Sequence, residues 1–232
     1  MKTRCPFSDC LHVFEVLDEL AVKPFTCDSC LREFTVRSLE RHEAVDRVVR
    51  LHQEAGTLFE VEKFELAASL PQVVAVLEDV RSLWNVGSMF RTADGAGCRH
   101  LFLTGITGYP PRKEIEKTSL GAESVIGWHY AGNSMSVLPA LKKLGYTILC
   151  LEKDENSLPL SCVIDQGCLE LPLCIVVGNE VTGLYRETLL ASDHTCHLPM
   201  RGIKTSLNVA VAFGIAAYQI AAGFELSGSG AA

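Results

Sequence analysis

The chain has 232 residues, of which 48% are apolar and 21% are charged, and its formal net charge is −7. This length fits one sizeable domain with a small appendage, because domains usually contain about 100–200 residues. No apolar stretch is long enough to cross a bilayer, and the early charges and cysteines do not match a secretory signal. We therefore expect a cytoplasmic protein with no membrane partner. The acidic balance excludes a uniformly basic surface, so any contact with nucleic acid must be local.

Ten cysteines fall into two groups. Six are scattered through apolar runs, and we interpret them as reduced thiols in the core of an intracellular protein. The other four are Cys5, Cys10, Cys27 and Cys30, which form two closely spaced pairs. Each pair precedes a short segment that contains a phenylalanine. Two such pairs present four thiolates, which is a ligand set typical of tetrahedral zinc.

Residues 3–36 resemble a zinc ribbon. The first cysteine pair departs from the usual pattern because four residues separate its members, where two are commoner, and His12 is a competing ligand. Four cysteine ligands leave no open coordination position, so the predicted zinc would be structural. The alternatives are a degenerate ribbon that has lost its metal and a small apolar cap that holds free thiols.

Two further segments flank the larger part of the chain. Residues 37–69 form a charged connection, and apolar residues near helical spacing predict a helix over residues 37–56. The acidic residues of this connection argue against a basic nucleic-acid-binding arm. Residues 225–232 are composed of Glu, Leu, Ser, Gly and Ala, and we expect a flexible tail there.

Residues 70–224 alternate short β-branched apolar runs with helical patterns. The runs cover residues 73–77, 101–103, 125–128, 146–151, 173–177 and 195–198, and the helical patterns cover residues 86–95, 112–120, 134–144, 184–191 and 207–224. This alternation predicts an α/β fold with a mostly parallel sheet covered by helices on both faces. Ligands bind such sheets at the carboxyl ends of the strands.

Three motifs follow the apolar runs at that predicted edge. They are Asn-Val-Gly-Ser-Met-Phe-Arg-Thr-Ala at residues 85–93, Gly-Asn-Glu-Val-Thr-Gly at residues 178–183, and Leu-Pro-Met-Arg-Gly followed by Ser-Leu-Asn-Val-Ala at residues 198–210. Local structure offers simpler explanations for their polar residues. Asn85 and Ser206 are of types that cap helices, Glu180 suits a helix start, and Arg91 could pair with Asp94. No G-x-G-x-x-G sequence follows a predicted strand, which argues against NAD and for another adenosyl cofactor.

In order and spacing, the three motifs resemble those of the SpoU (TrmH-like) branch of the SPOUT RNA methyltransferases. The resemblance covers about residues 70–224. It implies a C-terminal trefoil knot, S-adenosylmethionine bound in the knot loops, and a homodimer. It also implies that the sulfonium methyl group passes to a ribose 2′-hydroxyl of RNA, with no DNA substrate expected.

The resemblance assigns roles to three sets of residues. The catalytic set is Arg91, Asn85, Glu180, Ser206 and Asn208. The cofactor-binding set is Gly178, Asn179, Glu180, Leu198, Met200, Ser206 and Leu207. The RNA-binding set is Arg112, Lys113, Lys117, Arg201 and Lys204, although a charged surface helix is an equal explanation for residues 112–117.

The permanent charge of a guanidinium limits the role that Arg91 can have. Accounts of the family describe this arginine as the base that activates the 2′-hydroxyl, but a guanidinium is effectively always protonated in proteins. We therefore predict that Arg91 and the adjacent RNA phosphate hold the hydroxyl and stabilise its developing alkoxide, while the phosphate or water accepts the proton.

Two other functions are compatible with the same motifs. One is a catalytically silent SPOUT-fold module that binds RNA, and the other is a nucleic-acid adaptor built on the zinc ribbon. The complete set of polar motif residues argues against the first, and the lack of net positive charge in the ribbon argues against the second. The sequence leaves the RNA open and places a guanosine of the tRNA D-loop slightly ahead of a ribosomal RNA nucleotide.

Overall fold

The computed structural model describes residues 2–4, 13–15, 25–26, 33–34, 36–65 and 70–224. The chain divides into two compact units, Met1–Glu54 and Ala55–Ala232. In the first unit, β1 (Lys2–Arg4) pairs antiparallel with β2 (Val13–Glu15), and β3 (Phe25–Thr26) with β4 (Glu33–Phe34). The helix α1 (Val36–Ala55) begins and ends within one residue of the helix predicted over 37–56. Cys5, Cys10, Cys27 and Cys30 lie outside the described residues, so the zinc site stays a prediction.

A seven-stranded sheet forms the centre of the second unit, and each neighbouring pair of strands in it is parallel. The strands are β5 (Val73–Glu78), β6 (His100–Thr104), β7 (Gly127–Ala131), β8 (Thr147–Leu151), β9 (Leu158–Pro159), β10 (Leu173–Val177) and β11 (His194–His197). Their order across the sheet is β7-β6-β5-β10-β8-β11-β9. All residues of β6 and β10 are buried, because helices cover both faces. The predicted parallel α/β sheet is confirmed.

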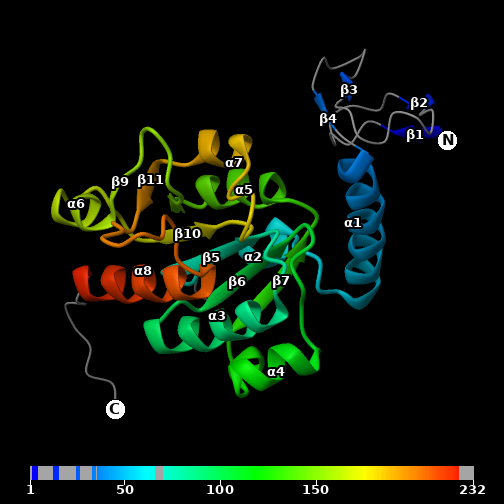
Figure 1. Cartoon of the computed structure of the whole chain (residues 1–232). Helices are drawn as coiled ribbons and strands as arrows, with labels where there is room; N and C mark the ends of the chain where they lie inside the picture. Colours follow the sequence, from blue (N-terminus) through cyan, green and yellow to red (C-terminus); the bar gives the residue numbers. More distant parts are fainter. Residues whose placement is uncertain are drawn as a thin grey trace. The chain divides into compact units, whose positions relative to one another are not determined.

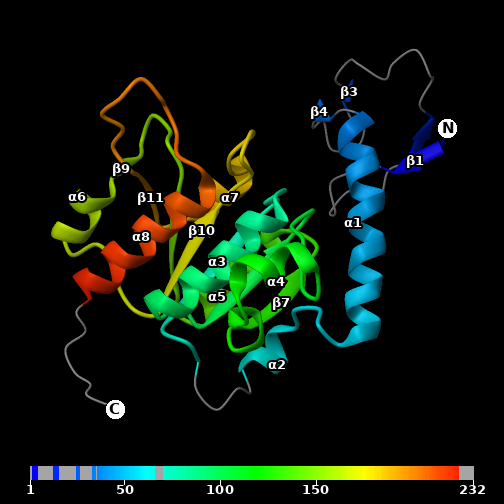
Figure 2. The ribbon, with the colours of Figure 1, turned by 60° about the horizontal axis from the view of Figure 1, so that its bottom comes forward.

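Helices pack on both faces of this sheet (Figure 1). The helices α3 (Leu83–Ala96), α4 (Lys113–Ser119) and α8 (Val209–Gly223) lie on one face, and α3 packs against both of the others (Figures 1 and 2). The opposite face carries α5 (Leu138–Lys143) and α7 (Arg186–Ala191). The remaining helical segments are α2 (Val61–Glu65), α6 (Leu160–Asp165) and the short 3-10 turns η2 (Ala122–Ser124) and η3 (Ser134–Ser136). Among the described residues, no helix is both long and apolar enough to cross a membrane.

The strand order places a switch point between β5 and β10. The chain runs from β5 outward through β6 to β7, then returns to build the other half of the sheet, where β10 lies between β5 and β8. In open parallel sheets, ligands bind at the carboxyl ends of the strands at such a point. Two of the three motifs leave the sheet here, one after β5 and one after β10. The trefoil knot implied by the resemblance stays a prediction.

The structure differs most from the predicted elements at β7 and at β9. The strand predicted over residues 125–128 begins two residues later, because Val125 ends η2 and is 68% exposed. The pair formed by β9 and α6 was not predicted, since β9 is only two residues long and ends in a proline.

Gly87 of the first motif allows α3 and α4 to approach closely. A Cβ at this position would lie 2.1 Å from the Thr118 Oγ1 and 2.4 Å from the carbonyl oxygen of Ile115. The second neighbour is backbone, so α4 itself would have to move. Overpacking of this kind costs about 1–3 kcal/mol, whereas replacing a helical glycine by alanine gains at most about 1 kcal/mol.

Gly87→Ala is therefore expected to lower the free energy of unfolding by about 1–2 kcal/mol, measured by urea denaturation. Gly214→Ala in α8 is the matched control, because its new Cβ would meet Thr92 Cγ2 at an ordinary 3.5 Å. Equal stabilities of the two variants would contradict the close approach of α4.

Candidate active site

Side chains from all three motifs meet at the switch point. The Glu180 carboxylate accepts hydrogen bonds from the backbone NH of Arg81 (3.0 Å), the backbone NH of Ser82 (3.1 Å) and Asn85 Nδ2 (2.9 Å). Asn208 Nδ2 in turn donates to Asn85 Oδ1 at 3.2 Å. We call the three side chains of Asn85, Glu180 and Asn208 the motif triad. Residues that are 95 and 123 positions apart in the sequence are thereby joined at one edge of the sheet.

The helix caps differ from the simpler explanations of the motifs. Ser82, and not Asn85, is the N-cap of α3, and its Oγ accepts from the backbone NH of Asn85 at 3.3 Å. Likewise Asn208, and not Ser206, caps α8 by accepting from the backbone NH groups of Ala210 and Val211. Asn85 lies inside α3, and its side-chain amide bridges Glu180 and Asn208 instead of capping the helix.

The charge state of Glu180 follows from its donors. Partial burial alone would raise its pKa, but hydrogen bonds from the backbone NH of Arg81, its own backbone NH, the Asn85 amide and the backbone NH of Ser82 outweigh that effect. The net result is a pKa below the ordinary value, since each of these donors favours the ionised carboxylate. The motif triad therefore contains a fixed negative charge beside the first turn of α3, where the helix dipole also favours it.

Two buried carboxylates behind the triad were not singled out from the sequence. Glu78 accepts from the backbone NH of Tyr185 (2.8 Å), while Asp79 accepts from the backbone NH of Ile106 (2.8 Å) and the Tyr185 hydroxyl (2.7 Å). The Asn179 amide donates to the carbonyl of Asp79 at 2.8 Å. Burial raises the pKa of Glu78. These bonds fasten the loop after β10 to the end of β5, so they position the second motif.

Gly178 and Gly183 let the second motif fold tightly on itself. Asn179 and Gly183 exchange backbone hydrogen bonds of 3.2 and 3.0 Å, and a Cβ on Gly178 would lie 2.6 Å from the Gly183 carbonyl carbon. Gly183 has φ +67°, a left-handed conformation that favours glycine. Glu152, which follows β8, accepts from the backbone NH of Leu184 at 2.9 Å and holds the far end of this loop.

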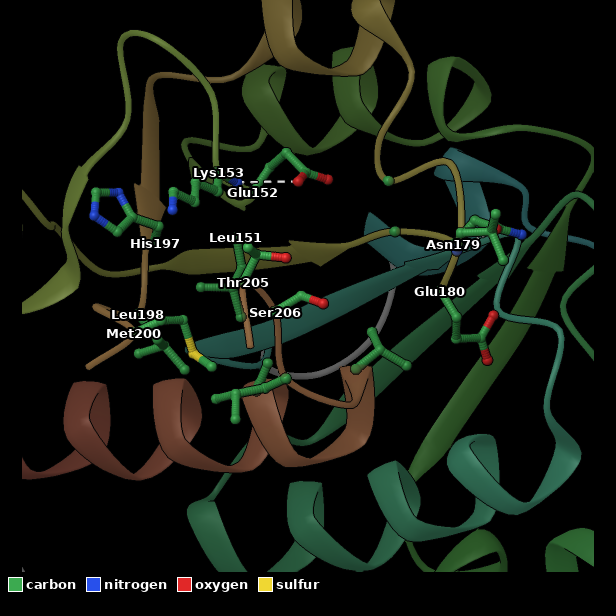
Figure 3. Close-up of a pocket in the computed structure, with 16 residues that line it drawn as sticks. Leu151, Glu152, Lys153, Asn179, Glu180, His197, Leu198, Met200, Thr205 and Ser206 are labelled. Carbon is green, nitrogen blue, oxygen red and sulfur yellow. Dashed lines mark hydrogen bonds between the residues drawn. The ribbon is translucent and has the colours of Figure 1, made fainter. Parts of the chain in front are cut away.

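A pocket of about 250 Å³ opens beside the triad, at the carboxyl ends of β8, β10 and β11 (Figure 3). Its lining includes all seven residues predicted to bind the cofactor, namely Gly178, Asn179, Glu180, Leu198, Met200, Ser206 and Leu207. Four further polar residues line it that sequence reasoning missed, namely Glu152, Lys153, His197 and Thr205. Glu152 and Lys153 directly follow a predicted strand and His197 lies in another, so the rule that ligands bind at carboxyl ends could have found them.

Five residues were predicted to be catalytic, and the structure brings four of them together. Glu180 and Ser206 line the pocket, and Asn85 and Asn208 adjoin it through the motif triad. Arg91 is different, because it lies six positions beyond Asn85 on α3, about 120° round the helix and about 9 Å along its axis. It is exposed and forms no ion pair with any described residue. The ion pair between Arg91 and Asp94 that was considered as an alternative is not formed. Asp94 Oδ1 instead lies 3.7 Å from Arg99 Nη1.

The residues predicted to bind RNA form two exposed groups. Arg112, Lys113 and Lys117 are in or next to α4, which packs against α3. Arg201 and Lys204 are in the loop between β11 and α8, whose residues line the pocket. Cations therefore flank the motifs from two directions in a chain of net charge −7.

Known RNA methyltransferases are similar to this chain in sequence. 23S rRNA (guanosine-2′-O-)-methyltransferase RlmB of Pseudomonas putida is 29% identical over 178 residues, which are 77% of this chain and 69% of the relative. The uncharacterized tRNA/rRNA methyltransferase Mb0905 of Mycobacterium bovis is 30% identical over 184 residues, or 76% of this chain and 63% of the relative.

Two solved structures share the fold. The AdoMet-bound rRNA methyltransferase from Sinorhizobium meliloti has a TM-score of 0.64 at 24% identity, over 73% of this chain and 62% of that one. The A. aeolicus TrmH/SpoU tRNA modifying enzyme has a TM-score of 0.60 at 22% identity, over 78% and 85%. The sequence profile of the SpoU rRNA Methylase family matches residues 72–218 and includes all three motifs. Because this match spans more than half of the 232 residues, the chain belongs to the SpoU rRNA Methylase family, as its motifs predict.

Proposed function

We propose that this protein transfers the methyl group of S-adenosylmethionine to a ribose 2′-hydroxyl of RNA. One observation supports the proposal above the others: the motif triad joins Asn85, Glu180 and Asn208 at the edge of a pocket whose lining contains every predicted cofactor-binding residue.

The pocket suits an adenosyl sulfonium cofactor by its chemistry. Leu198, Met200 and Leu207 offer apolar surface for a purine, while Thr205 and Ser206 add hydroxyl groups. The ionised Glu180 supplies a negative charge, which complements a cationic ligand. The volume of about 250 Å³ is slightly below the roughly 300–1,000 Å³ common for small-molecule sites.

Bound S-adenosylmethionine would supply an activated methyl group on a positively charged sulfur. The protein then has to align and desolvate the attacking hydroxyl, and proximity accounts for most of the acceleration. We infer that Asn85 and Asn208 would orient the ribose, and the hydrogen bond from Asn85 to Glu180 supports this role. Arg91 would hold the hydroxyl and a neighbouring phosphate and stabilise the developing alkoxide.

We favour ribosomal RNA as the substrate over the tRNA D-loop that sequence reasoning placed slightly ahead. The supporting observation is the name of the P. putida relative, which modifies a guanosine of 23S rRNA. One experiment tests both the reaction and the choice of RNA. The purified protein is incubated with labelled S-adenosylmethionine and either rRNA or tRNA, and the nucleosides are then analysed. A 2′-O-methylated nucleoside from rRNA is the expected product. Base methylation, or no transfer to either RNA, would overturn the proposed activity.

We further propose a homodimer that uses α8. This helix is almost wholly apolar, and in the single chain Val211, Ile215 and Tyr218 are 50%, 39% and 55% exposed. Their spacing places them on one side of the helix, where a second copy would cover them.

Ile215→Glu is expected to shift the protein from dimer to monomer in sedimentation experiments, because the variant would bury an unpaired charge at the interface. Leu190→Glu is the matched control, since Leu190 is 75% exposed but belongs to α7 on the opposite face of the sheet. A dimer that survives the Ile215 change, or a wild-type monomer, would contradict this interface.

Cys5, Cys10, Cys27 and Cys30 are proposed to hold one structural zinc ion. The support is their spacing alone, because these cysteines lie outside the described residues, and within the described part of the chain no cluster suits a metal. Metal analysis of the purified protein, with one zinc expected per chain, checks this proposal.

A further inference from the structure

Trp84 is an exposed tryptophan beside the motif triad. Its side chain is 49% exposed, although tryptophan is usually well buried in folded proteins. It directly precedes Asn85 in the first turn of α3. Its backbone carbonyl accepts a hydrogen bond from Thr118 Oγ1 of α4 at 3.1 Å, so the position of the residue is fixed between two packed helices.

One cation lies over this ring, on the α4 side. The Lys117 ammonium lies 5.6 Å from the centroid of the Trp84 ring, and the Arg112 guanidinium lies 5.2 Å from that of Tyr109. α4 also carries Glu114 and Glu116, so net charge alone does not define the surface. The distinguishing feature is a half-exposed indole with an ammonium group over one face, which leaves the other face for a stacking partner. Unpaired RNA bases stack on such surfaces, because the ring meets the base and the cation meets the phosphate.

We propose that Trp84 stacks on an unpaired base of the substrate RNA, at or next to the nucleotide whose ribose is methylated. The proposal rests on the proposed function, in which Asn85 orients that ribose. The two side chains leave α3 about 100° apart, Asn85 toward Glu180 and Trp84 toward Lys117. A strand whose ribose lies at Asn85 would therefore reach the indole with the base of that nucleotide or of its neighbour. Trp84 would thus act as a positioning residue for the RNA.

A second copy of the chain is the rival occupant. The contact between Trp84 and Lys117 turns the indole toward α4, whereas the exposed apolar side chains proposed for the dimer lie on α8. The two surfaces are therefore on different elements packed against α3, and the base is the better fit for Trp84.

Fluorescence gives a direct test on the folded protein. The chain has two tryptophans, Trp84 and Trp128, so Trp128→Phe leaves Trp84 as the single reporter. Adding substrate RNA is expected to quench this emission, whereas raising the protein concentration without RNA is not. Quenching that follows dimer formation and ignores RNA would assign Trp84 to a protein interface and overturn the proposal.

Kinetics give the second test. Trp84→Leu is expected to raise the KM for RNA about tenfold, within the range seen when a stacking aromatic is removed. Trp84→Phe should restore most of the affinity, and the Kd for S-adenosylmethionine should not change. Val125→Ala, which truncates a 68% exposed side chain in the turn after α4, is the matched control. If wild-type protein methylates ribose and Trp84→Leu has an unchanged KM, only the stacking role fails. If wild-type protein does not methylate ribose, the proposed function fails first.

Discussion

Replacement of Arg91 by alanine is expected to lower the rate of methyl transfer by about 10²–10³-fold, the range seen when a group that stabilises a developing oxyanion is removed. The affinity for S-adenosylmethionine should stay the same, because Arg91 is absent from the pocket lining and forms no ion pair with any described residue. Single-turnover rates at saturating cofactor, together with calorimetric cofactor binding, separate the two quantities.

Two variants sharpen this prediction. Arg91→Lys should not restore activity, since an ammonium is a point charge and cannot hold a hydroxyl and a phosphate with the forked geometry of a guanidinium. Arg99→Ala is the matched control, because it removes an exposed arginine that pairs only loosely with Asp94. Near-normal turnover by Arg91→Lys would show that the two-point contact is wrong.

Glu180→Ala is expected to lower kcat/KM roughly a hundredfold. The variant loses three hydrogen bonds that join the second motif to the start of α3, each worth about 1 kcal/mol net. Both cofactor binding and turnover should suffer, since Glu180 lines the pocket and also orients Asn85. Glu187→Ala, at an exposed glutamate on α7, is the control. Unchanged cofactor affinity in Glu180→Ala would show that Glu180 does not contribute to cofactor binding.

The depressed pKa of Glu180 also gives a pH dependence with a defined sign. A carboxylate whose pKa is lower in the folded state stabilises the fold above its unfolded pKa and loses that contribution as the pH falls through the folded value. Glu180 therefore stays ionised down to below its ordinary pKa of 4.5. Between pH 8 and pH 5, ionisation of Glu180 should therefore cause no loss of wild-type activity. Any loss measured in this range should have the same pH profile in Glu180→Gln.

The fold was predictable where strands are long and apolar on both faces. β10 ends where the sequence predicts, and β5 and β8 agree within one residue. β7 was misplaced because its first residues, Gly127 to His129, are not fully buried, so apolar character does not mark its start. β9 was missed because a two-residue strand has no periodicity to detect.

The site was predictable as a set of residues but less so as a geometry. Asn85 looks like a cap from its neighbours, but Ser82 caps α3 and the Asn85 amide bonds to Glu180 instead. That partner is 95 residues away, so local propensity carries no information about it. Glu78 and Asp79 were missed for the same reason, since their donors lie on other loops.

The central place of β10 also constrains how the chain acquires this fold. Both of its neighbours, β5 and β8, precede it in the sequence, so the middle of the sheet stays open until residues 173–177 have been synthesised. Such long-range pairing is slow to form. A nascent chain that stops earlier presents two unpaired apolar strand edges, which are templates for aggregation. The chain from β10 onward thus completes the pocket and also closes the sheet against self-association during synthesis.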